Sequence, residues 1–253
     1  MSTHENSPTI ILVPGHWLGA WAWDEVVEQL QDAGHRAVPL TLPGLDPHDP
    51  QRATRTLDDQ ADAIDRALES AAASGHGPAV LVAHSGANAP VSIVLDRHPE
   101  LVGHVIWVDS GPVAPGTVFA PDAPADLVEL PLPAFDVLGE QASLDGLDAG
   151  ALDRFREGAV PEPGPVLRQA VELANAERLD VPTTLVCCSI SGEQIRELAA
   201  AGHPMFAEVA GLRQVESIDL PTGHWPMWSR PQDLAEIIAA VATSQPLRPV
   251  VTG

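Results

Sequence analysis

The chain has 253 residues, 45% of them hydrophobic, and a formal net charge of −22. This length suits one α/β domain with a sizeable core, because a single sheet of that class commonly takes about 200 to 250 residues. The negative charge repels phosphate groups, so nucleic acid and anionic membranes are excluded as expected partners. All 13 basic residues are arginine, which excludes lysine Schiff-base chemistry and the lysine of phosphate-binding loops.

The hydropathy pattern, the first residues and the cysteines indicate neither a membrane protein nor an oxidising compartment. No run of about 18 apolar residues is present, so no transmembrane helix is expected. The start, Met1–Ser7, has neither the basic region nor the apolar stretch of a secretion signal. Cys187 and Cys188 are adjacent in an apolar run, so on a strand they would point to opposite faces as free thiols. We predict a cytoplasmic protein.

Strand and helix patterns alternate along the first 109 residues. The β-branched run 9–13 predicts a strand, and the amphipathic stretch 24–33 predicts a helix. The next expected elements are a strand over 36–40, a helix over 57–73, a strand over 79–82, a helix over 87–97 and a strand over 102–109. This order is typical of a parallel sheet with helices on both faces.

The alternation stops between residues 110 and 180, where proline, alanine, leucine and acidic residues dominate and one helix is expected near 152–157. It resumes with a strand over 182–189, a helix over 193–201, a strand over 212–220 and a closing helix over 232–242.

One short motif carries the strongest chemical signal. The apolar strand 79–82 leads into Ala83-His84-Ser85-Gly86-Ala87. A serine on a sharp strand-to-helix turn requires small residues two positions before and two after it, which Ala83 and Ala87 supply in place of the more usual glycines. The motif predicts an exposed nucleophile at Ser85.

Two further segments support this prediction. The first strand ends in Pro14-Gly15-His16-Trp17, followed by further tryptophans, and the last expected strand ends in Pro221-Thr222-Gly223-His224. These segments and the serine motif, in this order, resemble the α/β-hydrolase superfamily over nearly the whole chain, in particular its hydroxynitrile lyase, methylesterase-like and zearalenone-lactonase-like branches. Relatives usually have His-Gly where this chain has Pro14-Gly15.

The resemblance implies a domain organisation. It predicts an α/β-hydrolase core made of residues 1–111 and 179–253. It also predicts a helical cap, residues 112–178, inserted after the strand that ends at Asp109. This cap would cover the active site.

The expected site follows from sheet geometry. Parallel strands deliver their carboxyl ends to one edge, so Ser85, Asp109 and the loop with His224 are expected to converge. His224 would act as the base for Ser85, and a carboxylate would orient its imidazole. The backbone N–H groups of His16 and Gly86 are the expected oxyanion-hole donors.

The carboxylate of this triad has two candidates. Most relatives carry an aspartate after the strand that here ends near Ser189, but the residues that follow are Ile190-Ser191-Gly192-Glu193. Glu193 is better placed in the first turn of a helix, where a carboxylate is favoured by the helix dipole. Asp109 ends the strand after the serine motif and is the favoured candidate, as in dehalogenases and lactonase-like relatives. A turn-capping role for Asp109 is the alternative.

The remaining histidines and tryptophans have simpler interpretations. His48 lies near Asp46 and Asp49, where a proline-rich loop is favoured over a metal site, and no cofactor is expected. In the family, the position of His84 points away from the substrate. Trp17 follows the proposed oxyanion donor and is expected to line the substrate pocket, which favours an apolar substrate over a sugar or a charged metabolite.

Three functions are considered. The first is a serine hydrolase that cleaves a hydrophobic carboxylic ester or lactone through an acyl-enzyme. The second is a cofactor-free lyase, cyclase or oxygenase that uses His224 as its base. The third is a non-catalytic binder of small molecules. The sequence leaves the exact substrate and the oligomeric state open, a homodimer included.

Overall fold

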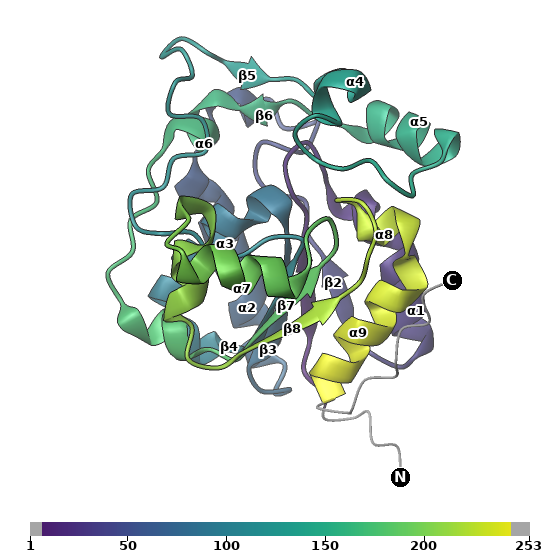
Figure 1. The fold of residues 1–253 in the computed structure, drawn as a ribbon, viewed down its shortest axis with the longest axis vertical. Coiled ribbons are helices and arrows are strands. Elements are labelled where there is room, and N and C mark those ends of the chain that lie inside the picture. The colour runs from purple at the N-terminus through teal and green to yellow at the C-terminus, as the bar shows by residue number, and fades with distance from the viewer. Residues whose placement is uncertain (1–6, 244–253) are drawn as a thin grey trace.

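A computed structural model describes residues 7–243. Six parallel strands form one sheet in the order β2-β1-β3-β4-β7-β8, with helices on both faces (Figure 1). The strands are β1 (Ile10–Val13), β2 (Ala37–Pro39), β3 (Ala79–His84), β4 (Val102–Val108), β7 (Thr183–Cys187) and β8 (Val215–Asp219). The predicted α/β-hydrolase architecture is confirmed.

The helices that cover the sheet begin and end close to their predicted positions. They are α1 (Asp24–Asp32), α2 (Leu57–Ala73), α3 (Asn88–Arg97), α7 (Gly192–Ala200) and α9 (Pro231–Thr243). The start of α2 is fixed by a capping box, in which Thr56 accepts from the Asp59 amide and Asp59 accepts from the Thr56 amide. Ser191 and Gln194 form the same motif at the start of α7.

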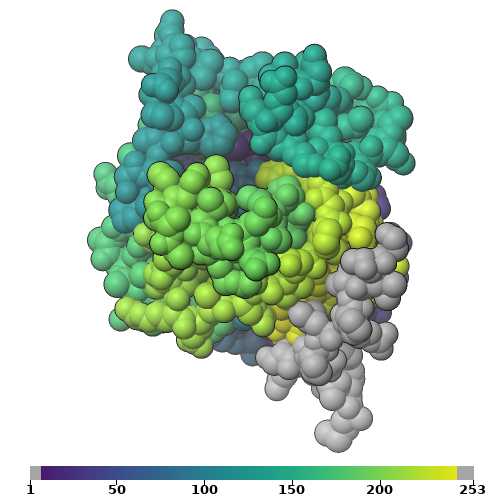
Figure 2. Space-filling view, in the orientation of Figure 1, coloured from purple at the N-terminus to yellow at the C-terminus, as the bar shows by residue number. Residues whose placement is uncertain are grey.

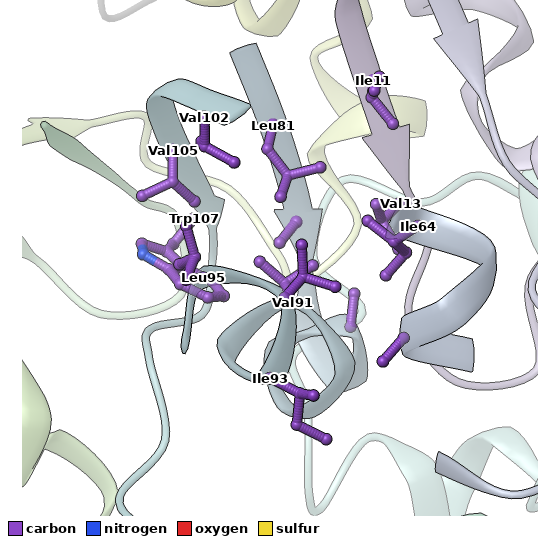
Figure 3. Close-up of a cluster of buried hydrophobic side chains, with 14 of the residues drawn as sticks. Ile11, Val13, Ile64, Leu81, Val91, Ile93, Leu95, Val102, Val105 and Trp107 are labelled. Carbon is purple, nitrogen blue, oxygen red and sulfur yellow. The ribbon is translucent and has the colours of Figure 1, made fainter. Parts of the chain in front are cut away.

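Alternating side chains of the strands build two cores. On one face, residues of β1, β3 and β4 pack with α2, α3 and α7, and Figure 3 shows part of this cluster around Leu81, Val91 and Trp107. On the other face, the alternate residues pack with α1 and α9. Cys187 belongs to the first cluster and Cys188 to the second, so the prediction of free thiols on opposite faces is confirmed, and both thiols are buried.

The last strand differs from its prediction. The pattern 212–220 predicts a strand of nine residues, but β8 covers only Val215–Asp219, because residues 212–214 form the bend that follows a 3₁₀ helix, η6 (Pro204–Gly211). β8 is the edge of the sheet and pairs only with β7 among the described residues, so its side chains are half-buried or exposed.

The middle of the segment between β4 and β7 lies at the top of Figure 1, and its last part runs down the side of the molecule to β7. It contains a two-stranded antiparallel sheet of β5 (Glu129–Leu130) and β6 (Glu162–Pro163), with the helices α4 (Phe135–Leu138), α5 (Ala149–Gly158) and α6 (Gly164–Arg168). The expected helix near 152–157 corresponds to α5, whereas the sheet and the shorter helices carry no periodic sequence pattern. The 112–178 boundary of the cap stays a prediction.

Two observations concern membranes and localisation. No helix in residues 7–243 is long and apolar enough to cross a membrane. Most of the N-terminal stretch Met1–Ser7, on which the cytoplasmic prediction depends, lies outside the described residues.

Candidate active site

Ser85 stands at the tip of a strained turn. It follows β3 directly and opens a short 3₁₀ turn, Ser85–Ala87, which continues into α3. Its φ of 51° lies in the left-handed region, which is unfavourable for a residue with a side chain. The preceding strand is fully buried and hydrogen-bonded on both sides, so the surrounding structure holds the turn in this conformation.

Backbone strain is found at two further residues near Ser85. Among the described residues, the non-glycine residues with positive φ are Trp17 at 66°, Ser85 at 51° and Asp109 at 43°. All three line one pocket. Positive φ at residues with side chains is uncommon and concentrates at functional sites.

A continuous chain of hydrogen bonds joins three residues from distant parts of the sequence. Ser85 Oγ lies 2.8 Å from His224 Nε2, and His224 Nδ1 lies 2.6 Å from Asp109 Oδ2. His224 is carried by the loop between β8 and α8 (Pro226–Ser229). The carboxylate accepts from Nδ1–H, so Nε2 is left to accept the Ser85 proton.

Asp109 is held by the neighbouring strand end. Its Oδ1 accepts from the amides of Cys188 and Ser189, at 3.0 and 2.9 Å, and its Oδ2 accepts from Ser189 Oγ at 2.5 Å. Burial alone would raise the pKa of Asp109, but the hydrogen bonds with His224 and Ser189 outweigh it and the pKa lies below its usual value. The carboxylate therefore remains ionised and can stabilise an imidazolium at His224.

Glu193 takes the other position considered for it. It is exposed and lies in the first turn of α7, next to the capping residue Ser191. The structure thus brings Asp109, and not Glu193, into contact with His224.

The loop after β1 lies against the serine. A Cβ placed on Gly15 would be 2.8 Å from Ser85 Cβ and 3.0 Å from the His84 carbonyl oxygen, so only glycine fits at this point. His16 follows, and a Cβ on Gly86 would be 2.3 Å from its ring. The two predicted oxyanion residues therefore face each other beside Ser85.

The His84 side chain contacts the loop that carries His224. It is buried, lies in the pocket lining beneath the triad, and donates from Nε2 to the His224 carbonyl oxygen at 2.7 Å. Burial, with the neighbouring His224, lowers the pKa of His84 to about 3, so the side chain is neutral at physiological pH. The serine motif predicted the turn, but nothing in it indicated that His84 would hydrogen-bond to the loop that carries His224.

The pocket has a volume of about 770 Å³. It lies between Ser85 and the segment above the sheet, where Figure 2 shows a hollow between the teal segment and the green α7 and η6. Trp17 is in the lining, as are residues that no motif indicated. These are Phe119, the stretch Leu138–Asp145, Ile190, Ile195, Met205 and Phe206.

A metal site near His48 was considered as the alternative to a loop. Within residues 7–243, no group of three His, Cys, Asp or Glu side chains that could hold a metal ion occurs. The His48 amide donates to Asp46 Oδ1 at 2.9 Å, which is an ordinary loop contact.

Comparison with known proteins identifies the family. The model of the alpha/beta hydrolase family matches residues 10–237. The chain belongs to this family. Its predicted class, a hydrolase, is thereby confirmed at the level of the family.

Sequence identity to individual relatives is low or covers only part of the chain. The chain is 26% identical over 249 residues to a pyrethroid hydrolase of Sphingobium wenxiniae, a match that covers 92% of this chain and 87% of that protein. It is 36% identical over 100 residues to the esterase PIR7B of Oryza sativa, covering 39% of this chain and 37% of the rice protein. The structure of a methylesterase from Arabidopsis has 16% sequence identity and a TM-score of 0.69, covering 93% and 99% of the two chains.

Proposed function

We propose that this hydrolase cleaves a neutral, hydrophobic carboxylic ester or lactone through an acyl-enzyme on Ser85. The observation that carries the proposal is the hydrogen-bonded series Ser85, His224 and Asp109, with contacts of 2.8 and 2.6 Å. The named relatives, an esterase and a pyrethroid hydrolase, support the same class of reaction.

In this mechanism His224 Nε2 takes the proton of Ser85 as Oγ bonds to the acyl carbon. The tetrahedral oxyanion accepts from the N–H groups of His16 and Gly86. His224 then gives the proton to the leaving alcohol oxygen as the ester C–O bond breaks. A water molecule, activated by His224, hydrolyses the acyl-enzyme and restores Ser85. Asp109 keeps the imidazole oriented throughout.

The pocket supports a neutral, apolar substrate. Trp17, Phe119, Leu138 and Phe206 contribute apolar surface. Of the residues that line this pocket in the described chain, none is arginine, whereas Glu140 and Asp145 are acidic. A negatively charged acyl group would meet repulsion without a cationic partner.

Fluorophosphonate labelling combined with ester turnover tests the proposal. The wild-type protein is expected to be labelled and to hydrolyse p-nitrophenyl esters, with neutral acyl chains preferred over anionic ones of similar size. Ser85→Ala is expected to lose the label and to lose turnover by on the order of 10⁴-fold or more, with an unchanged unfolding temperature.

Other outcomes would point elsewhere. Near-normal turnover by Ser85→Ala would exclude an acyl-enzyme. Labelling of the wild type without turnover of any ester or lactone would favour a reaction in which His224 acts as a base toward the substrate itself. A preference for short anionic esters would contradict the substrate class.

A further inference from the structure

Glu162 is a buried acid that the mechanism above does not use. It lies in β6, above the sheet, and is 1% exposed. Its carboxyl group contacts His16 Nδ1 at 3.0 Å, the Trp17 amide at 3.4 Å and Gln60 Nε2 at 3.1 Å. A buried carboxyl group is costly unless its oxygens are hydrogen-bonded. Here two of the three partners belong to the loop beside Ser85.

The same loop makes two other hydrogen bonds with the segment above the sheet. Trp17 Nε1 donates to the Leu130 carbonyl oxygen at 3.0 Å, and the Val160 amide donates to the Trp17 carbonyl oxygen at 3.0 Å. These bonds hold Trp17 at its φ of 66°. The conformation of the loop therefore depends on contacts from β5, β6 and the residues just before β6.

The ring of His16 connects Glu162 to the second oxyanion residue. It is about nine-tenths buried, and it packs so closely on Gly86 that a Cβ there would lie 2.3 Å from Nε2 and Cδ2. Phe119 covers the ring with a centroid separation of 4.2 Å. Fixing the ring thus fixes the spacing between the His16 backbone and Gly86.

We propose that Glu162 is a positioning residue for the oxyanion hole. It orients the His16 imidazole and the Trp17 amide, and through them it sets the direction of the His16 N–H. The inference rests on the proposed hydrolase mechanism. Because oxyanion donors act mainly on charge that develops in the transition state, their misalignment lowers kcat while ground-state binding changes little.

Glu162→Gln is the direct test, because glutamine keeps the volume but loses the charge. Glu129→Gln is the matched control. Glu129 lies in β5, opposite Pro163 of β6, and pairs with Arg52, with no contact to the loop among the described interactions. For both variants, kcat, KM and the Ki of a trifluoromethyl ketone, whose adduct with Ser85 carries an oxyanion, are measured with the full-length protein.

We expect Glu162→Gln to lower kcat and the affinity for the ketone together by on the order of 10²-fold, the usual effect of one oxyanion donor, with KM nearly unchanged. Glu129→Gln is expected to match the wild type in all three quantities. A lower unfolding temperature with normal kcat and normal ketone affinity would overturn the proposal, since it would leave Glu162 with a purely structural role.

His16→Leu provides an independent test if Glu162→Gln does not fold. It removes the ring but keeps the backbone N–H, so a similar selective loss of kcat is expected, and wild-type kcat in this variant would overturn the proposal. Where both variants fold, Glu162→Gln should cost less in the His16→Leu background than alone. Additive losses would show that Glu162 does not act through His16.

The two proposals fail in distinguishable ways. A wild-type protein that neither reacts with fluorophosphonate nor turns over esters would refute the hydrolase mechanism itself. A wild-type protein that does both, with a fully active Glu162→Gln variant, would refute only the positioning role.

Discussion

Two parts of the pocket are held by different kinds of contact. The floor consists of Ser85 and Asp109 at the ends of β3 and β4, and the roof is the part of the segment between β4 and β7 that lies above them. On the floor, Ser85 and Asp109 each follow a strand that is paired in register, since His84 lies opposite Val108 and Val108 opposite Val186. β3 and the last four residues of β4 are buried in the cores that flank the sheet. Their positions are thus fixed by repeated ladder hydrogen bonds and by packing on two faces.

The roof is held by single contacts between residues far apart in the sequence. Phe155, which is fully buried, packs against Trp225 and Trp228 with ring centroids 5.2 and 5.1 Å apart, and individual hydrogen bonds add to this packing. The His224 amide donates to the Ser143 carbonyl oxygen at 2.7 Å, and the Gly223 amide donates to that of Asp145 at 3.1 Å. The strands of the roof are only two residues long. This difference suggests that the floor determines the chemistry, whereas the roof determines which substrates enter and, through Glu162, how the oxyanion loop is held.

The largest expected effect concerns the floor. Asp109→Asn should lower kcat/KM by on the order of 10³- to 10⁴-fold, because the amide cannot stabilise the imidazolium and favours the wrong tautomer of His224. Glu193→Gln should keep most of the activity. Steady-state kinetics on one p-nitrophenyl ester decides this, and the reverse ranking would show that Glu193 orients His224.

The contact between the first loop and the serine turn is expected to be nearly as sensitive. A methyl group on Gly15 would meet backbone and Cβ atoms at 2.8 to 3.0 Å, which cannot move away easily. Gly15→Ala should therefore displace His16 or Ser85 and lower kcat/KM by on the order of 10²-fold.

Gly103→Ala is the control for this substitution. Gly103 lies in β4, and its added Cβ would meet nothing closer than 3.4 Å, so near wild-type activity is expected. Equal activity of the two variants would contradict a rigid contact between the loop and the turn.

A third prediction uses the buried His84 beneath the triad. Its folded-state pKa of about 3 lies below the ordinary value of 6.5, so between these values the unfolded chain binds the extra proton. Stability should consequently fall as the pH decreases through this window, by at most about 1.4 kcal/mol per pH unit. The lowered pKa of Asp109 acts in the same direction at lower pH, below 3.8.

Urea unfolding of His84→Gln between about pH 4 and pH 6 measures the contribution of His84. Glutamine can still donate to the His224 carbonyl oxygen but does not titrate, so the slope of stability against pH should be shallower than in the wild type. His48→Gln, at an exposed loop position, is the control and should leave the slope unchanged. An unchanged slope in His84→Gln would mean that His84 is not the buried neutral group described.

The smallest expected effect concerns the roof. Phe119 is 52% exposed and lies in the pocket lining. Phe119→Ala should shift the preference among esters toward bulkier acyl groups by roughly three- to tenfold. Because Phe119 also covers the His16 ring, the readout is the ratio of kcat/KM between esters and not the activity on one ester. Val128→Ala, an exposed residue of the same segment outside the pocket lining, is the control. An unchanged preference among the esters would contradict a role of Phe119 in substrate selection.

Much of the floor could be predicted from the sequence, because each of its parts has a local signal. The β-branched run 9–13 and the apolar strand before Ser85 indicate strands, and the small residues around the serine indicate the sharp turn. The choice of Asp109 over Glu193 followed from the rule that parallel strands end at one edge. In each case the pattern is dictated by backbone geometry within a few residues.

The contacts that hold the oxyanion loop and the histidine loop could be identified only from the tertiary structure. The sequence by itself determined the order of the sheet elements and the place of the nucleophile, because hydrophobic periodicity and turn sterics are properties of neighbouring residues. Glu162 has no such signal, since it is a single acid between two prolines, 146 positions after His16. The bond between them, and the contact of Ser143 with the histidine loop, exist only because non-periodic segments pack across the carboxyl edge of the sheet. Such packing depends on complementary shape and hydrogen bonding between distant residues, which no local pattern encodes.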